Sequence, residues 1–325
     1  MTVETPKEGI YPGVPFTEYL EWDAINDSFL SELVSRSPAH AKATQEEPKD
    51  TEAFRIGRAL HTRALEPGVF EQRYAIRPDC DRRTKDGKAI YEAWVASLDG
   101  KEELSQAEAE SIDAMCKAME RLTIHRWIEQ GKAEVCIVWR DARTGILCKG
   151  RLDYWQEELN AIVDLKSCQD ASARAFARDV FGYRYYQKAA WYCDGLGCLT
   201  GQDPSFVFIA VEKKRPYACA AYQLEDTAII GGRKAYRKAL DIYRECAATN
   251  YWPGYPDRVE ILSLPAWALG EMGVGQYNLV REDEINGNEN NEPKTTHKRF
   301  ISGSSVTDWD ALERDARDAE QHPEG

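Results

Sequence analysis

The stretch that decides the fold reads Gly150-Arg151-Leu152-Asp153-Tyr154 and, after a polar turn, Ile162-Val163-Asp164-Leu165-Lys166. Both halves alternate as β-strands do, and residues 156–160 between them predict the turn that folds one strand back onto the other. Antiparallel pairing would place Asp153 beside Asp164. Because side chains two residues apart leave a strand on the same face, Asp164 and Lys166 would point the same way. The stretch therefore predicts two carboxylates and one ammonium group on one patch of sheet.

This combination of charges favours a metal site. Two carboxylates held that close repel each other unless a cation lies between them. Hard oxygen ligands with an open, hydrated position suit Mg²⁺. A lysine beside such an ion can stabilise charge developing on a phosphate or help to activate water. The alternative is a surface hairpin with solvated charges, and on these three residues alone that alternative would be preferred.

Further segments extend the pattern along the chain in a fixed order. They are Gly57-Arg58-Ala59-Leu60-His61, Glu134 in Ala133-Glu134-Val135, Lys149-Gly150-Arg151-Leu152-Asp153, Asp164-Leu165-Lys166 and Tyr185-Tyr186-Gln187-Lys188-Ala189-Ala190-Trp191-Tyr192. In this order the chain resembles the PD-(D/E)xK nuclease superfamily and, within it, the exonuclease VIII (RecE-like) phage exonucleases. The resemblance runs from residue 19 to residue 267. Asp-x-Lys alone is weakly specific, whereas five ordered segments are fairly specific.

The resemblance implies a fold and a set of site residues. The fold is α/β, with a restriction-endonuclease-like core in which a mixed sheet is flanked by helices, and with an N-terminal helical extension. His61, Asp153, Asp164 and the Leu165 carbonyl would hold Mg²⁺, for which Mn²⁺ could substitute. Lys166 would position or activate water, and Glu134 would assist as a ligand of the metal or of water. The ordinary alternatives are a packed or exposed histidine and a solvated glutamate.

One segment departs from the family pattern. Relatives carry a glutamine four residues before a tyrosine, on one face of a helix. Here Lys188 stands four residues before Tyr192, and Gln187 lies one residue earlier, which is about 100° of helix rotation. Either Lys188 replaces the glutamine, or Gln187 reaches the site differently. A third interpretation is that the aromatic residues of this helix are simply core.

The net charge of -13 argues against DNA binding by a uniform surface, because duplex DNA is itself strongly negative. Part of the excess acid lies beyond residue 281, and a local basic channel in an acidic protein can steer DNA. We predict phosphate contacts from seven cations, although the run at residues 82–88 would ordinarily be a solvated loop. They are Arg82, Arg83, Lys85, Lys88, Lys149, Arg151 and Lys188.

Composition indicates a cytoplasmic protein. No run of 18 apolar residues predicts a membrane span, and residues 1–8 do not have the pattern of a secretion signal. The nine cysteines have neither CxxC pairs nor zinc spacing, which is typical of reduced thiols. The spacing of Cys80, Cys193, Cys198 and Cys219 does not fit the iron–sulfur cluster found in some relatives.

We predict three parts: an extended arm over residues 1–20, a nuclease domain over 21–270 and an acidic, disordered tail over 271–325. Within the domain the patterns predict helices and strands. The helices are expected over 26–35, 50–66, 89–98, 106–130, 172–196 and 226–249. A three-stranded meander is expected over 134–166, and a second hairpin from strands 206–212 and 218–224.

The predicted activity is Mg²⁺-dependent digestion of linear duplex DNA from its ends, 5′ to 3′, which leaves 3′ single strands for phage-type recombination by strand annealing. The resemblance also implies a ring-shaped homo-oligomer, such as a tetramer, and a single-strand annealing protein as partner. Two alternatives remain open: an endonuclease or repair nuclease of the same superfamily, and a catalytically idle DNA-binding module. Intact Asp153, Asp164 and Lys166 favour an enzyme, since a binding module does not need two repelling carboxylates.

Overall fold

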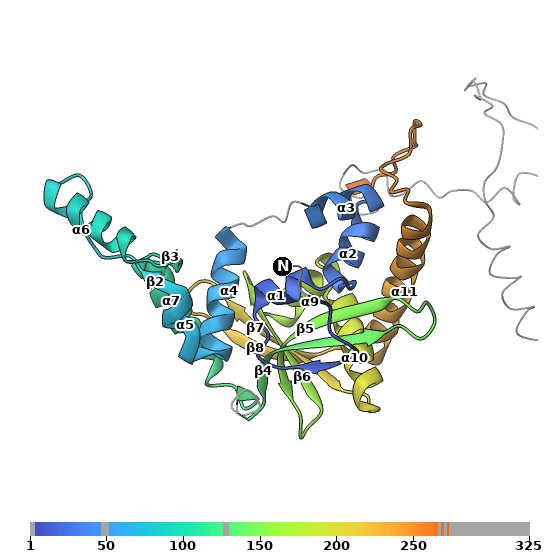
Figure 1. The fold of residues 1–325 in the computed structure, drawn as a ribbon, viewed down its shortest axis with the longest axis horizontal. Coiled ribbons are helices and arrows are strands. Elements are labelled where there is room, and N and C mark those ends of the chain that lie inside the picture. The colour runs from blue at the N-terminus through green and yellow to red at the C-terminus, as the bar shows by residue number, and fades with distance from the viewer. Residues whose placement is uncertain (1–3, 47–51, 126–129, 266–267, 270–271, 273–325) are drawn as a thin grey trace, which may run out of the picture. The chain divides into compact units, whose positions relative to one another are not determined.

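The computed structural model describes residues 4–46, 52–125, 130–265, 268–269 and 272. The chain divides into two units, Met1–Arg258 and Val259–Gly325, and the fold described below is that of the first (Figure 1). Apart from Met272, the predicted tail over residues 271–325 lies outside the described residues. The predicted boundary at residue 270 and the disorder of the tail therefore stay predictions.

A six-stranded mixed sheet forms the centre of this unit, in the strand order β1-β4-β5-β6-β7-β8. Its strands are β1 (Gly9–Tyr11), β4 (Lys132–Arg140), β5 (Leu147–Gln156), β6 (Ala161–Cys168), β7 (Ser205–Glu212) and β8 (Cys219–Gln223). Neighbouring strands are antiparallel except β6 and β7, which are parallel. A parallel pair needs a crossover connection, and α9 (Ala173–Gly182) with α10 (Tyr185–Thr200) supplies it. The predicted meander and second hairpin are confirmed.

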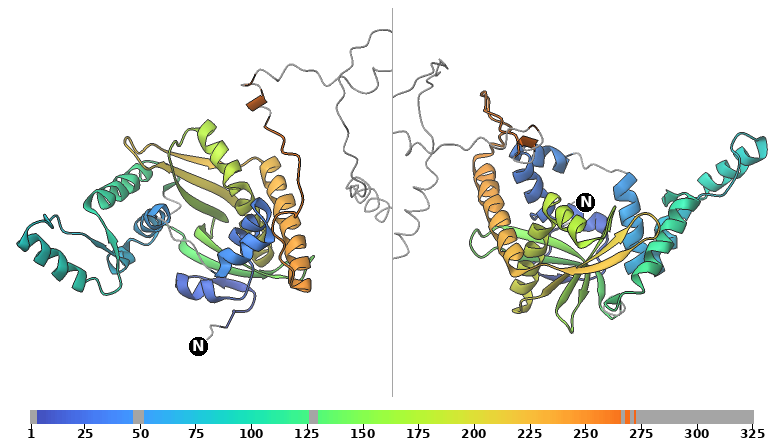
Figure 2. Two further views of the ribbon diagram at one scale, coloured as in Figure 1. Left: turned by 90° about the horizontal axis from the view of Figure 1, so that it is seen from above. Right: turned by 180° about the vertical axis from the view of Figure 1, so that it is seen from behind.

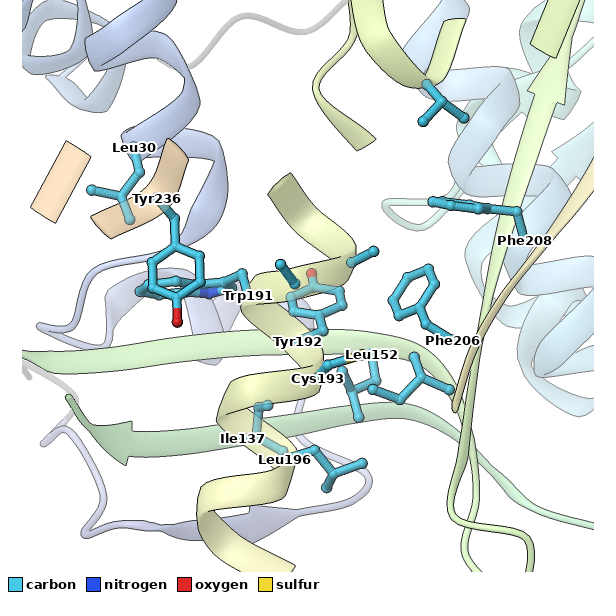
Figure 3. Packing of buried hydrophobic residues seen from close by; sticks show 14 of the residues in the cluster. Leu30, Ile137, Leu152, Trp191, Tyr192, Cys193, Leu196, Phe206, Phe208 and Tyr236 are labelled. Atoms are coloured by element: carbon cyan, nitrogen blue, oxygen red, sulfur yellow. The ribbon is translucent and has the colours of Figure 1, made fainter. Parts of the chain in front are cut away.

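Helices pack on both faces of the sheet (Figures 1 and 2). On one face, α10, α11 (Asp226–Thr249) and α2 (Asp27–Ser35) bury a core with β4, β5 and β7. Figure 3 shows its centre, where Trp191 of α10 packs edge-on against Tyr236 of α11 at a ring distance of 5.3 Å. On the other face, α4 (Glu52–Leu65) and α7 (Gln106–Met119) pack on β6 and β7. This arrangement confirms the predicted α/β class with a restriction-endonuclease-like core.

An outlying lobe follows α4 in the chain. It contains α5 (Pro67–Arg73), α6 (Lys85–Ala96) and a two-stranded parallel sheet of β2 (Tyr74–Ile76) and β3 (Glu102–Leu104). Figures 1 and 2 show α6 projecting away from the central sheet. Pro67 does not stop the chain from being helical, because proline is well accepted at the first position of a helix.

Several predicted elements differ from the structure. The predicted helix over 172–196 is two helices, because Arg184 adopts a left-handed backbone conformation with φ of 57°. The arm over residues 1–20 is not simply extended, since it pairs as β1 with β4 and then enters α1 (Phe16–Glu21). The helix predicted over 106–130 ends at Met119 as α7, and residues 126–129 lie outside the described residues. A short helix, α3 (Pro38–Glu46), was not predicted.

Candidate active site

The candidate site forms where β5 and β6 separate. Their antiparallel ladder runs from Gln156↔Ala161 to Tyr154↔Val163, which puts Asp153 and Asp164 at the next register position, as predicted. From there β5 continues against β4 and β6 continues against β7. The Leu165 amide donates to Asp153 Oδ2 at 2.9 Å. The Asp153 side chain thus accepts the hydrogen bond that a backbone carbonyl of a neighbouring strand would otherwise accept.

Asp164 lies at the centre of the site and has no exposed surface. The Lys166 ammonium group donates to its Oδ2, and Lys188 Nζ lies 2.7 Å from its Oδ1. Oδ1 nevertheless lacks a hydrogen-bond partner within the described part of the chain, so its contact with Lys188 is an ion pair without hydrogen-bond geometry. This buried oxygen could therefore coordinate a metal ion.

His61 reaches the same point from α4. Its Nε2 lies 2.9 Å from the Leu165 carbonyl oxygen, and its Nδ1 lies 3.6 Å from Asp153 Oδ2. Burial raises the pKa of Asp153, but the charges of His61, Lys188 and Lys166 outweigh burial and hold that pKa well below its usual range. Asp153 is therefore an ionised carboxylate at neutral pH.

Glu134 lies across the strand pair from Asp153, between the register pairs Ala133↔Tyr154 and Val135↔Leu152. Its backbone is left-handed, with φ of 52°, a conformation that is strained for glutamate and often found at functional sites. Burial raises the pKa of Glu134, and its carboxylate pairs with Arg151. Glu134 therefore lies next to the site, and its assistance to a metal or to water stays a prediction.

The two lysines of the site differ in their surroundings. Burial lowers the pKa of Lys166, whose ammonium group also lies 5.2 Å from the centre of the Tyr185 ring. Burial acts in the same direction on Lys188, but the attraction of Asp164 outweighs it and raises the pKa of Lys188. Lys188 also lies 5.1 Å from the centre of the Tyr192 ring. Both ammonium groups neutralise the carboxylates around them.

Of the alternatives left open for α10, the structure places Lys188 at the site and Gln187 elsewhere. Gln187 is fully buried and donates hydrogen bonds to Asp27 Oδ1 and Ser31 Oγ of α2, each at 2.9 Å. Its carbonyl oxygen accepts from the Arg184 guanidinium group. Gln187 thus joins α10 to α2, and the structure does not bring it to Asp164. A catalytic role for Gln187 was a wrong prediction.

The donor set of the site fits a metal ion in its chemistry. Among the described residues, no group of three His, Cys, Asp or Glu side chains is arranged to hold a metal, and two ammonium groups pair with Asp164. The chemistry of the donors nevertheless fits a hard divalent ion, because two carboxylates, a main-chain carbonyl and an imidazole converge here. His61, Asp153, Asp164 and the Leu165 carbonyl would hold the ion. When bound, it would polarise a phosphate and lower the pKa of water.

Two of the cations predicted to bind DNA stabilise the fold instead. Lys149 is buried, and its ammonium group donates to the carbonyl oxygens of Tyr19, Leu20 and Trp22 at 2.8, 3.2 and 2.7 Å. These carbonyls lie at the C-terminal end of α1, where a positive charge is favourable. Burial lowers the pKa of Lys149 to about 8. The prediction that Lys149 contacts phosphate is therefore wrong.

Arg151 is buried in the same way. Its guanidinium group pairs with Glu134, donates to the Val14 carbonyl oxygen at 2.8 Å and lies over the Phe16 ring at 5.5 Å. With only 9% of its surface exposed, Arg151 cannot bind a DNA phosphate without breaking its contacts with these partners. The prediction of a phosphate contact is wrong for Arg151 as well. Both errors have the same cause. The alternation of polar and apolar residues along β5 does not show that the N-terminal segment covers the face that carries Lys149 and Arg151.

Replacing Lys149 by methionine is expected to lower stability and leave DNA affinity unchanged. Loss of the ammonium group leaves three buried carbonyls without their donor, at about 2 kcal/mol or more, which corresponds to a fall in Tm of roughly 5 °C. Thermal unfolding and fluorescence anisotropy with labelled duplex DNA would measure the two effects. Lys214→Met, at an exposed lysine in the β7–β8 loop, is the control. If the folded Lys149 variant loses DNA affinity and the control does not, Lys149 does contact phosphate.

Lys188 pairs with Asp164 at the site, and its contact with DNA stays a prediction. The other four predicted cations, Arg82, Arg83, Lys85 and Lys88, lie before and within the first turn of α6. All four are exposed, and the Arg82 guanidinium group lies 4.8 Å from the centre of the Tyr91 ring. They belong to the outlying lobe and not to the metal site (Figure 1). Lys85 and Lys88 are helical and do not form part of a loop, because Thr84 caps α6 by accepting from the Gly87 amide. Their contact with DNA stays a prediction.

Comparison with known proteins identifies the family. A family model described as a PDDEXK-like domain of unknown function (DUF3799) matches residues 28–265 of this chain. The chain belongs to this family. The matched span of the PDDEXK-like domain contains every residue of the site described above, from His61 on α4 to Tyr192 on α10. Membership of the PD-(D/E)xK superfamily is thereby confirmed, and nucleases of that superfamily generally use divalent metal ions.

Solved structures support the fold of this PDDEXK-like domain. A crystal structure titled "Putative exonuclease" from Eubacterium rectale is similar with a TM-score of 0.52 and 14% identity, covering 76% of this chain and 92% of that one. The structure of SSO0001 is matched with a TM-score of 0.25 and 14% identity, covering 56% of this chain and 86% of that one. A search of curated proteins found no match. None of the described helices has the length and apolar character needed to cross a membrane.

Proposed function

We propose that this chain hydrolyses DNA phosphodiester bonds with the help of Mg²⁺, and that Mn²⁺ can substitute. The observation that carries this proposal is the meeting of Asp153, Asp164, the Leu165 carbonyl and Lys166 where β5 and β6 separate. Carboxylates and a carbonyl suit a hard cation. An ammonium group beside them suits the charge that develops on a phosphate.

The geometry supports a role for each of these residues. His61, Asp153, Asp164 and the Leu165 carbonyl would bind the ion. Lys166 lies 3.2 Å from the Leu165 carbonyl oxygen and 3.9 Å from Asp153 Oδ2, so it would be next to a phosphate held there and could stabilise its negative charge or orient water. Lys188 would hold Asp164 from the side of α10, and the Tyr192 ring would support Lys188.

We further propose that the enzyme digests linear duplex DNA from its ends, 5′ to 3′, and leaves 3′ single strands. The ordered segments around His61, Glu134, Asp153, Asp164 and Lys188 support this task through their resemblance to the RecE-like exonucleases. A ring-shaped homo-oligomer, such as a tetramer, and a single-strand annealing protein as partner rest on the same resemblance. So does a place in phage-type recombination.

The deciding experiment compares linear and closed circular duplex DNA. The full chain would be incubated with Mg²⁺, with Mn²⁺ or with EDTA, and each linear substrate would carry a label at either the 5′ or the 3′ end. We expect degradation of the linear form alone, early release of the 5′ label and no reaction in EDTA. Nicking of the circle would select an endonuclease. Binding of DNA with no cleavage under any metal would select the idle module.

A further inference from the structure

Four aromatic side chains gather at the corner between α9 and α10: Phe181, Tyr183, Tyr185 and Tyr186. Phe181 and Tyr183 are 77% and 67% exposed. Phe181 stacks on Tyr186 with 6.1 Å between ring centroids, and Tyr183 stacks on Tyr185 with 5.5 Å. Each pair therefore presents one ring to solvent and backs it with a second. We call these four residues the aromatic corner.

The aromatic corner adjoins the candidate active site. The Tyr185 ring lies 5.2 Å from Lys166 Nζ, and Lys166 in turn contacts Asp164. A molecule that rests on the exposed Tyr183 ring is thus two aromatic rings away from the proposed catalytic lysine. The proposed reaction requires the substrate strand to reach Lys166.

The corner is held firmly in place. Arg184, between Tyr183 and Tyr185, has a left-handed backbone and donates to Gln187 Oε1 through Nε at 3.1 Å and Nη2 at 2.6 Å. Gln187 is fully buried and hydrogen-bonded to Asp27 and Ser31 of α2. The rings therefore sit on a fixed turn, and binding to them loses little conformational entropy.

We propose that the aromatic corner stacks unpaired bases of the DNA strand that enters the active site. Stacking on exposed aromatic rings is how proteins hold single strands without reading their sequence, because every base has a π-face. The Arg184 guanidinium group lies 5.8 Å from the Tyr186 ring centroid and adds positive charge at the same corner. This inference rests on the proposed function and adds to it that the strand is unpaired where it meets the protein.

The test measures binding in EDTA, so that cleavage does not enter. The probes are a labelled oligothymidylate and an oligonucleotide of the same length whose sugars carry no bases. The variants are Tyr183→Ala, Phe181→Ala and both together. Tyr251→Ala, which removes a 69% exposed tyrosine beyond α11, is the matched control. Since both replaced rings are exposed, thermal unfolding should show an intact fold in every variant.

We expect the parent to bind oligothymidylate about tenfold or more tightly than the abasic strand. The double variant should lose most of this difference, and Tyr251→Ala should keep it. Equal binding of the two probes by the parent would overturn the inference, as would an equal loss in the control. If the chain proves not to be a nuclease but the base-dependent difference depends on the aromatic corner, only the proposed function fails. Cleavage without base-dependent binding would refute the stacking role of the aromatic corner and leave the proposed function standing.

Discussion

Replacing Asp164 by alanine is expected to abolish DNA cleavage. The carboxylate has no exposed surface and lies between two ammonium groups, and its loss removes one of the two carboxylates that would bind the metal. Because polarisation by a metal contributes several kcal/mol to the transition state, the rate should fall roughly 10³-fold or more. Asp153→Ala should lower the cleavage rate to a similar extent, and EDTA should abolish cleavage by the parent protein. The measurement is the initial rate on labelled linear duplex.

Loss of fold must be separated from loss of chemistry. Alanine at position 164 leaves Lys166 and Lys188 without their counter-charge, and an unpaired buried charge destabilises by about 3–5 kcal/mol. Asp164→Asn keeps the shape of the side chain and is the better variant for kinetics. Circular dichroism and Tm would check its fold, and Asp241→Asn, which replaces a carboxylate on the surface of α11, is the matched control. Near-parent activity in a folded Asp164→Asn protein would refute the site assignment.

Replacing Lys166 by methionine should reduce turnover by about 10²-fold or more, which is typical of losing one electrostatic contact in a transition state. Affinity for DNA should change little, because the surface remains. Metal should bind no more weakly, because the ligands remain and a competing positive charge is lost. Single-turnover kinetics would report the chemical step, and calorimetry with Mn²⁺ would report metal binding. A loss of DNA affinity in proportion to the loss of rate would make Lys166 a phosphate anchor.

Lys188→Met provides the matched comparison, because it removes the other ammonium group from the same carboxylate. Its Nζ lies 2.7 Å from Asp164 Oδ1, the oxygen that lacks a hydrogen bond. A competing cation is thereby removed from a metal ligand, so Mn²⁺ should bind more tightly in this variant than in the parent protein. Equal effects of the two replacements on both rate and metal affinity would mean that the lysines act only through their summed charge.

The centre of the site was predictable from the sequence because it depends on short-range geometry. A two-residue period places Asp164 and Lys166 on one face, and a short polar turn fixes which residue of β5 lies opposite. The register found for Tyr154 and Val163 follows from that turn. His61 was found through the resemblance alone, because its nearest partner, Leu165, is 104 residues away.

The errors arose where distant segments decide the outcome. Lys149 and Arg151 alternate as exposed cations would, yet residues 14–22 cover them. The sequence pattern predicted one helix over 172–196, whereas the left-handed backbone of Arg184 and its bonds to Gln187 mark the break between α9 and α10. The sequence set the relative rotation of Gln187 and Lys188, and packing against α2 determined which of them faces Asp164.

The hydrogen bonds of Lys149 to the end of α1 affect the choice of where a recombinant fragment should begin. The family match starts at residue 28, but the carbonyl partners of Lys149 and Arg151 lie at residues 14–22. A fragment cut at the family boundary would lack these acceptors and would uncover the face of the sheet that residues 14–22 cover. It would also remove β1 from β4 and so expose a strand edge of the kind that drives aggregation. Expression of the matched span alone should therefore give insoluble protein, and fragments intended for crystallisation should retain residue 9 onward.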